Sequence, residues 1–430
     1  MEGYHSKYSF RTFLILATGQ TVSIVGSGLT GFTLGIWIYQ KTHSATQFAL
    51  IMLCAFLPAI FISPVAGVIV DRYNRKWVMI AADTGAGLCT LSVALLFITG
   101  KLVLWHIFLF GGLTSMCGAF QSPAFTSTFS LLVSEDQLGR ANGLWQTGQS
   151  LGQIVSPVVA GFLVIRIGVQ GVMMIDFATF LFAVTTTLAV RFPRLEISPE
   201  LKKAQMSLFS EFLVGVNYVR HRAGLFSLLG ISALSNYCVG IIIVLFTPMM
   251  LNLTTPETLG RVFSIGGFGG FLGGVLLSVW GGPKRKIMGF LGFMFVSGLF
   301  TMLCGLKPSM ALIAGALFGV FFTIPLINGC DQVIWQKKIP PEIQGRVFSA
   351  RNMIGMSMMP ISFLCAGPFA DRIFEPLFAT GGALVPLFGP IFGTGPGRGI
   401  GFLFSILGLL ISLITVIGYT YRPLRNVEAE

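Results

Sequence analysis

Apolar residues in this chain fall into long, nearly unbroken segments that recur from one end to the other. A helix that crosses a lipid bilayer needs about 20 predominantly apolar residues, and these segments reach that length or exceed it. The pattern predicts an all-α membrane protein with twelve transmembrane helices. The expected spans are residues 12–38, 46–70, 77–99, 102–132, 138–165, 169–190, 223–250, 258–280, 286–306, 309–336, 343–374 and 398–420.

The longest polar interruption separates the sixth expected span from the seventh. Near its end Leu208, Phe212 and Val219 recur at helical spacing. Such spacing is typical of an amphipathic helix, which we expect to lie on the cytoplasmic membrane surface. The interruption therefore predicts three parts: an N-terminal six-helix bundle over 1–190, a linker over 191–222 and a C-terminal six-helix bundle over 223–430.

The two predicted bundles repeat each other in sequence. VSEDQLGRANGLWQ (133–146) matches KIPPEIQGRVFSAR (338–351), and GVIVDRYNRK (67–76) matches GVLLSVWGGPKRK (274–286) at nearly the same spacing. Two separate matches at one spacing indicate the duplication of a six-helix unit. Repeats of this kind are typical of secondary transporters that bind their substrate centrally, between two helical bundles.

Composition and charge agree with a membrane-embedded chain. Of the 430 residues 54% are hydrophobic, and the mean hydropathy is +0.81. The net charge of +12 comes mainly from Lys and Arg on the side of the N-terminus, which predicts that both termini are cytoplasmic. The basic excess thus reflects topology, and no nucleic acid partner is expected. The seven Cys lie in apolar segments and the four His are scattered, so no metal site is expected.

Charge is concentrated where the second span ends, in GVIVDRYNRKWVMIAAD (67–83). Gly67 allows close helix packing, and Asp71 lies at the membrane boundary, where a carboxylate can meet an arginine or a helix N-terminus. Arg72, Arg75 and Lys76 follow on the cytoplasmic side. Contacts of these groups can hold one conformation of a transporter. The alternative is that the charges only set topology.

A stripe of small residues marks the fifth span, in GQSLGQIVSPVVAG (148–161). Small side chains every four residues, followed by a proline kink, suit close and sliding contact between helices. The residues are Gly148, Gly152, Ser156, Pro157, Ala160 and Gly161.

These motifs resemble those of the major facilitator superfamily. G-x-x-x-D-R-x-x-R-K is its signature for the loop between spans two and three, and 148–161 is similar to the antiporter signature of drug:proton exporters, with Ser156 and Ala160 in place of glycines. SATQFALI, GRVFSAR and FGTGPGRGIGFLF extend the resemblance to the macrolide-efflux type branch, also called transmembrane secretion effectors. The resemblance implies that two six-helix bundles alternate around a central site, and that Asp71 latches against the start of span eleven near Arg346.

Three carboxylates at membrane depth, Asp83, Asp176 and Asp331, are candidates for proton coupling, because acids in the hydrocarbon region are costly and usually functional. Each has a structural alternative. Asp331 could pair with Arg351 on the next span, Asp83 could support the basic loop near it, and Asp176 could pair with Arg166.

Polar residues on the spans that line the cavity in this superfamily are the substrate-site candidates: Gln20, Gln121, Asn236 and Asn328, with Tyr237 beside them and Gln149 and Gln153 on span five. Few polar groups among many aromatic ones suit a large amphiphile, although ordinary helix packing would use the same residues. FGTGPGRG (392–399) resembles a phosphate loop but lacks the strand and the Lys-Ser/Thr of one, and we expect it only to begin span twelve.

The sequence thus predicts a proton-coupled exporter of an amphiphilic small molecule, such as a macrolide-like drug or a siderophore, working by alternating access. It is not expected to be an enzyme or to hold a cofactor, since the proton gradient supplies the energy. Expected partners are the substrate, protons and membrane lipids, and the expected state is a monomer in a bacterial plasma membrane. The alternatives are an importer or lipid-moving transporter of the same fold, or a transport-dead membrane interaction protein.

Overall fold

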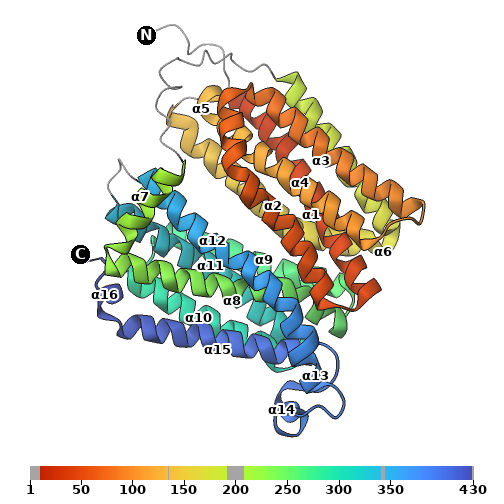
Figure 1. Cartoon of the computed structure of the whole chain (residues 1–430), viewed down its shortest axis with the longest axis vertical. Helices are drawn as coiled ribbons and strands as arrows, with labels where there is room; N and C mark the ends of the chain where they lie inside the picture. Colours follow the sequence, from red (N-terminus) through yellow and green to blue (C-terminus); the bar gives the residue numbers. More distant parts are fainter. Residues whose placement is uncertain (1–9, 134, 191–207, 340–343, 429–430) are drawn as a thin grey trace. The chain divides into compact units, whose positions relative to one another are not determined.

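The structure is a computed structural model that describes residues 10–133, 135–190, 208–339 and 344–428 (Figure 1). Nearly all of these residues are helical, and they include no β-strand. The first part of the chain holds α1 (Phe10–Thr42), α2 (Ala45–Arg72), α3 (Arg75–Ile98), α4 (Leu104–Thr126), α5 (Phe129–Leu132) and α6 (Glu135–Ala189). The second part holds α7 (Leu208–Arg220), α8 (Ala223–Leu253), α9 (Pro256–Trp280), α10 (Lys286–Leu306), α11 (Met310–Lys338), α12 (Gln344–Pro368), the π-helical turn η2 (Phe369–Phe374), α13 (Glu375–Phe378), α14 (Val385–Phe392), α15 (Arg398–Thr420) and α16 (Arg422–Arg425).

These helices confirm the all-α fold class that the sequence predicts. Among the described residues, 10 helical segments are long and apolar enough to cross a bilayer. The fourth and fifth spans predicted from the sequence correspond to α4 and to the first half of α6. The expected fifth and sixth spans are both contained in α6, whose course changes at Gly168, where φ is 68° and ψ is 178°. That left-handed backbone conformation favours glycine, so a single residue separates two spans.

The fourth crossing is shorter than the sequence predicted. The expected span 102–132 ends as α4 at Thr126, and α5 follows as a separate turn. Pro123 lies in the last turn of α4 and cannot donate a backbone hydrogen bond. The hydroxyls of Ser127 and Thr128 then donate to the carbonyls of Ala124 and Phe125, which closes the helix end.

The chain divides into two compact units, Met1–Thr42 with Leu50–Ala204, and His43–Ala49 with Gln205–Glu430. In unit 1, α1 packs along α6 and α3 packs against α4 and α6. Glycines on α1 make the first contact possible. A Cβ at Gly19 would collide with Thr186 Oγ1, and one at Gly28 would collide with Ser156 Oγ.

In unit 2 the long helices pair as α8 with α12, α9 with α11, and α10 with both α11 and α15; Figure 1 shows them side by side in green to blue. The α10–α15 contact also depends on glycine, because a Cβ at Gly305 would collide with the carbonyl oxygen of Gly401. Helix α7, where the sequence predicts an amphipathic linker helix, packs on α12 and α8. Val219, one of the residues at helical spacing, is buried, whereas Leu213 on the same helix is exposed.

Helix α2 begins in unit 2 and continues in unit 1, because its first five residues belong to the second unit. Its N-terminus is held by Asp371 in η2. The carboxylate accepts hydrogen bonds from Ser44 Oγ at 2.8 Å, from the Ala45 amide at 3.1 Å and from the Thr46 amide at 2.9 Å. Amides in the first turn of a helix have no partner within the helix, and a carboxylate there also favours the helix dipole.

Candidate functional site

Three of the sequence-predicted residues form one polar chain inside unit 1. Asp83 on α3 is 4% exposed, and its Oδ2 accepts a hydrogen bond of 2.8 Å from Gln20 Nε2 on α1. Gln20 Oε1 in turn accepts a hydrogen bond from Gln121 Nε2 on α4. A proton-coupling candidate is thereby connected to two substrate-site candidates. A change in the charge of Asp83 can reach Gln121 through a single intervening side chain.

Asp176 lies elsewhere in unit 1, on α6, and is 1% exposed. Its carboxylate accepts from Ser27 Oγ on α1 at 3.5 Å and from Thr90 Oγ1 on α3 at 3.3 Å. The pairing with Arg166 considered from the sequence is wrong. The Arg166 guanidinium instead lies over the Phe162 ring, 4.0 Å from its centroid. The two residues share α6, but the turn at Gly168 comes between them.

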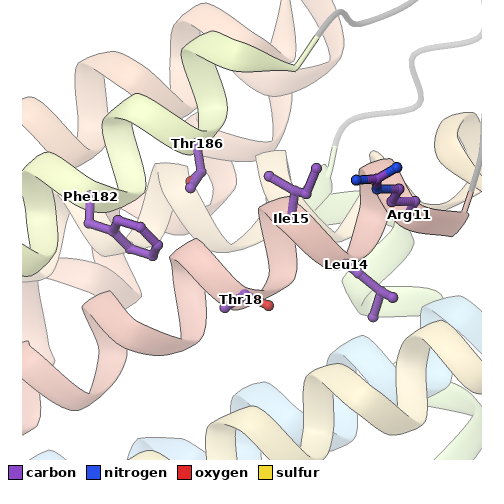
Figure 2. A pocket seen from close by; sticks show the side chains of 6 residues that line it. All are labelled: Arg11, Leu14, Ile15, Thr18, Phe182 and Thr186. Atoms are coloured by element: carbon purple, nitrogen blue, oxygen red, sulfur yellow. The ribbon is translucent and has the colours of Figure 1, made fainter.

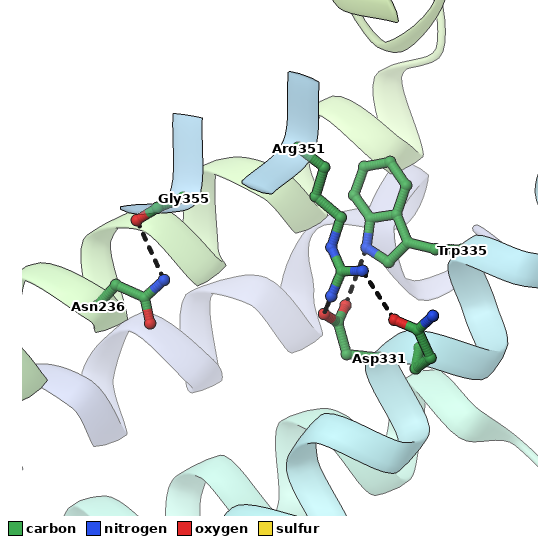
Figure 3. A network of polar contacts seen from close by, with 6 residues as sticks. Asn236, Asp331, Trp335, Arg351 and Gly355 are labelled. Atoms are coloured by element: carbon green, nitrogen blue, oxygen red, sulfur yellow. Dashed lines mark hydrogen bonds and ion pairs between the residues drawn. The ribbon is translucent and has the colours of Figure 1, made fainter. Parts of the chain in front are cut away.

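In unit 2, Asp331 on α11 forms an ion pair with Arg351 on α12 (Figure 3). Asp331 Oδ1 also accepts a hydrogen bond of 3.0 Å from Trp335 Nε1, and Arg351 Nη1 donates to Gln332 Oε1 at 2.9 Å. The guanidinium also lies over the Trp335 ring, 5.3 Å from its centroid. The ion pair between Asp331 and Arg351 that the sequence offered as a structural role is therefore present. Trp335 and Gln332 add two hydrogen bonds and one cation–π contact to it.

The remaining substrate-site candidates are dispersed. Asn236 on α8 donates to the carbonyl of Gly355 on α12 at 3.2 Å, as Figure 3 shows, so it joins two helices. Tyr237, on α8, lies beside Cys365, which is on α12. Asn328 is exposed on the surface of unit 2, and Gln149 is half-buried in unit 1. The side chain of Gln153 lies outside the described part of the chain.

A groove on the surface of unit 1, of about 270 Å³, contains none of these candidates (Figure 2). It runs between α1 and the end of α6. Its lining residues are Arg11, Leu14, Ile15, Thr18, Phe182 and Thr186.

The basic residues of the expected latch have partners within unit 1. Arg75 Nη1 donates to the Ser127 carbonyl at 2.6 Å, and Lys76 Nζ donates to the carbonyls of Leu188 and Val190 at 2.8 and 2.7 Å. Cations at such carbonyls complete helix ends and are favoured by the helix dipole. These two residues therefore fix the start of α3 to the chain just after α4 and to the end of α6. Gly67, Asp71, Arg72 and Arg346 lie outside the residues whose side chains are described.

The small-residue motif of span five packs on α1. A Cβ at Gly148 would collide with Thr21 Oγ1, and a Cβ at Gly152 would lie 2.6 Å from Ile24 Cγ2. Ser156 Oγ donates to the Val25 carbonyl at 3.0 Å. Ala160 is buried, as is Gly161, while Pro157 lies one turn earlier at partial exposure. The motif serves close packing of two helices in unit 1.

Two ionic residues of unit 2, one buried and one half-buried, were missed from the sequence. Arg398 is 2% exposed and donates from Nε to the Phe392 carbonyl at 2.6 Å and from Nη2 to the Gly305 carbonyl at 2.8 Å. Glu375 accepts from the amides of Gly397 and Ile400 at 2.9 and 3.0 Å. Both hold the start of α15, which begins at Arg398 as the FGTGPGRG segment predicted. The sequence predicts only that Arg398 lies where span twelve begins, and the one signal for its burial is its place among glycines at 393, 395 and 397 that have positive φ.

The described part of the chain holds no group of three or more His, Cys, Asp or Glu placed to bind a metal ion. Helices long and apolar enough to cross a membrane, arranged in two units with polar groups buried in each, are the architecture of an integral membrane transporter. The chain belongs to the Major Facilitator Superfamily, whose family model matches residues 16–363. It is accordingly a transporter and not an enzyme.

The curated relatives include proteins named for macrolide efflux and multidrug efflux. Macrolide efflux protein A of Streptococcus pyogenes is 29% identical over 379 residues, covering 87% of this chain and 92% of that protein. Macrolide efflux protein A of Enterococcus faecalis is 30% identical over 315 residues, covering 72% of this chain and 96% of that protein. Multidrug efflux pump Tap of Mycolicibacterium fortuitum is 22% identical over 370 residues, covering 83% of this chain and 88% of that protein.

Solved structures share the fold at low identity. The nucleoside transporter NupG aligns with a TM-score of 0.69 at 14% identity, covering 96% of this chain and 100% of NupG. A bacterial homologue of the human lysosomal transporter Spinster, in an inward-facing conformation, aligns with a TM-score of 0.66 at 14% identity, covering 97% of both chains. At this identity the similarity concerns the fold alone.

Proposed function

We propose that this transporter exports an amphiphilic small molecule in exchange for protons, and that Asp83 carries the coupling proton. The observation on which this rests is the chain Asp83–Gln20–Gln121, which links a buried carboxylate to side chains of α1 and α4. In proteins of this fold those helices line the substrate path. The site is proposed to operate in a bacterial plasma membrane, with both termini in the cytoplasm and the chain acting as a monomer among lipids.

The partners of the three acids favour Asp83 for this role. Asp331 faces Arg351, so a proton on Asp331 would leave a buried guanidinium without its counter-charge. Asp83 is bound by the neutral amide of Gln20, which can adapt to either protonation state. A carboxylate needs a donor, which the amide nitrogen supplies. A protonated carboxyl is itself a donor and needs an acceptor, which the amide oxygen supplies after a flip.

That flip carries the protonation state onward. When Gln20 turns its oxygen to a protonated Asp83, its nitrogen takes the place next to Gln121, which until then was the donor. Two donors cannot share a hydrogen bond, so the Gln121 amide must also reorient. Its nitrogen and oxygen would then exchange places toward the substrate path. One proton thereby changes which hydrogen bonds a substrate can form, and shifts the equilibrium between conformations.

The proposed substrate is amphiphilic because the relatives are named for macrolide and multidrug efflux. The small-residue contact between α1 and the first half of α6 is proposed to let these helices slide during transport. The Asp71 latch against the N-terminal end of α12 near Arg346 remains part of the proposal. An acid at the end of span two would there favour the dipole of another helix.

Everted membrane vesicles test the assignment. With a pH gradient established and read by a fluorescent dye, a macrolide is expected to release protons from vesicles that contain the wild-type protein. Asp83→Asn is expected to bind the macrolide but to lose at least tenfold in gradient-driven transport, because an amide cannot exchange a proton. Glu257→Gln, which changes an exposed acid on α9, is the control and is expected to transport normally. Undiminished proton exchange in Asp83→Asn would show that Asp83 is not the carrier.

A further inference from the structure

Asp176 differs from the other two buried acids because it is surrounded by hydroxyl groups. Ser27 on α1 and Thr90 on α3 contact its two carboxylate oxygens, so three helices of unit 1 meet at this group. Gly26 makes the approach possible, since a Cβ there would lie 2.9 Å from Asp176 Oδ1. The described part of the chain supplies no cationic side chain as a partner for this carboxylate.

Thr30 provides a second and independent observation. It lies almost one turn after Ser27 on α1 and is 8% exposed. Its Oγ1 is fully buried and lies beside the Asp176 carboxylate, but it forms no hydrogen bond of normal geometry with any described residue. A buried hydroxyl without a hydrogen bond is costly. This oxygen is therefore free to turn a lone pair toward a ligand shared with the Asp176 carboxylate.

The distances between the oxygens fit a bound cation better than a hydrogen-bonded cluster. Hydroxyl-to-carboxylate hydrogen bonds are about 2.5–2.7 Å long. The distances from Asp176 to Ser27 and Thr90 are 3.5 and 3.3 Å. When oxygens hold a hard cation at about 2.4 Å, two ligands at a right angle lie about 3.4 Å apart. The separations around Asp176 are those of neighbouring ligands in such a shell.

The chemistry of the partners separates this site from Asp83. The group that faces Asp83 is an amide nitrogen, which has no lone pair to offer a cation. The groups that face Asp176 are hydroxyls, whose oxygens can turn their lone pairs inward. A single negative charge in an apolar bundle is balanced by one positive charge, whereas a divalent ion would leave an excess charge buried.

We infer that Asp176, Ser27, Thr30 and Thr90 form a binding site for a monovalent hard cation, Na⁺, between α1, α3 and α6. Binding there joins three helices of unit 1 through one ion. The inference goes beyond proton-coupled export and does not depend on Asp83.

Binding of radioactive Na⁺ to the purified full-length protein tests the inference, with choline chloride holding the ionic strength constant. Wild-type protein is expected to bind Na⁺ saturably at one site. Asp176→Asn is expected to abolish binding, and Thr30→Val to raise the apparent Kd at least tenfold. Thr33→Val is the matched control, because Thr33 is also on α1, buried, and without a hydrogen bond among the described residues. It is expected to bind as wild type does.

Three results would overturn the site: no saturable binding by wild type, unchanged binding in Asp176→Asn, or equal behaviour of Thr30→Val and Thr33→Val. Should Asp176→Asn fail to fold, the two threonine variants still decide, since valine has nearly the shape of threonine. Asp83→Asn is expected to bind Na⁺ normally. The proposal of proton coupling through Asp83 and the inference of a Na⁺ site at Asp176 can therefore be refuted independently of each other.

Discussion

Removing Arg351 should be among the most damaging single changes in unit 2. The pair with Asp331 is buried, with 19% and 9% of the two side chains exposed. Arg351→Met keeps the length of the side chain but leaves the carboxylate without its counter-charge. Breaking a buried pair from one side costs about 3–5 kcal/mol. Because Trp335 Nε1 still donates to Asp331 at 3.0 Å, we expect the lower end of that range, about 3 kcal/mol.

The double variant Asp331→Asn/Arg351→Met provides the critical comparison. It removes both charges, and replacing a whole buried pair by neutral groups is often close to neutral. We therefore expect the double variant to recover most of the free energy of unfolding lost in Arg351→Met. Unfolding by titration with a denaturing detergent, followed by tryptophan fluorescence, measures all three proteins. A single variant that loses less than about 1 kcal/mol, or a double variant no more stable than the single one, would refute the reasoning.

Two further predictions concern helix contacts. Gly305→Ala should lower the thermal midpoint of the purified protein, at a cost of about 1–3 kcal/mol, because its Cβ would collide with the carbonyl oxygen of Gly401. Gly292→Ala, on the same helix with open space around it, should leave the midpoint unchanged or raised, and equal effects of the two changes would contradict the packing. Asp371→Ala should destabilise by about 1–2 kcal/mol because the first amides of α2 lose their acceptor. Ser44→Ala removes one of the three hydrogen bonds, so a thermal shift as large as that of Asp371→Ala would contradict the cap.

The sequence predicted the helices well because each crossing requires a long apolar segment, and glycine or proline usually marks its end. It also placed Asp331 and Arg351 at a similar depth on successive spans, where the structure joins them. The link from Asp83 through Gln20 to Gln121 could not be predicted, since it depends on the rotation of three helices about their axes. All three residues were candidates, but nothing in their spacing indicates that they touch.

The hydroxyls around Asp176 were missed for a different reason. Ser and Thr in a transmembrane helix usually bond to a carbonyl of their own helix, as Thr186 does to Ala183, and so give no signal of a site. The burial of Arg398 was missed because a charge at the end of an expected span normally indicates topology. Its three carbonyl contacts come from two segments far apart in the sequence, which no local pattern reveals.

Helix α2 has a consequence for how this protein can move. The first turn of α2 is hydrogen-bonded to Asp371 in η2, whereas the part of α2 that follows Ala49 belongs to unit 1. One continuous helix therefore connects the two units. A movement of one unit against the other must bend α2 near its N-terminus or break the hydrogen bonds between its first turn and Asp371. The three hydrogen bonds to Asp371 therefore resist any movement that would displace the start of α2.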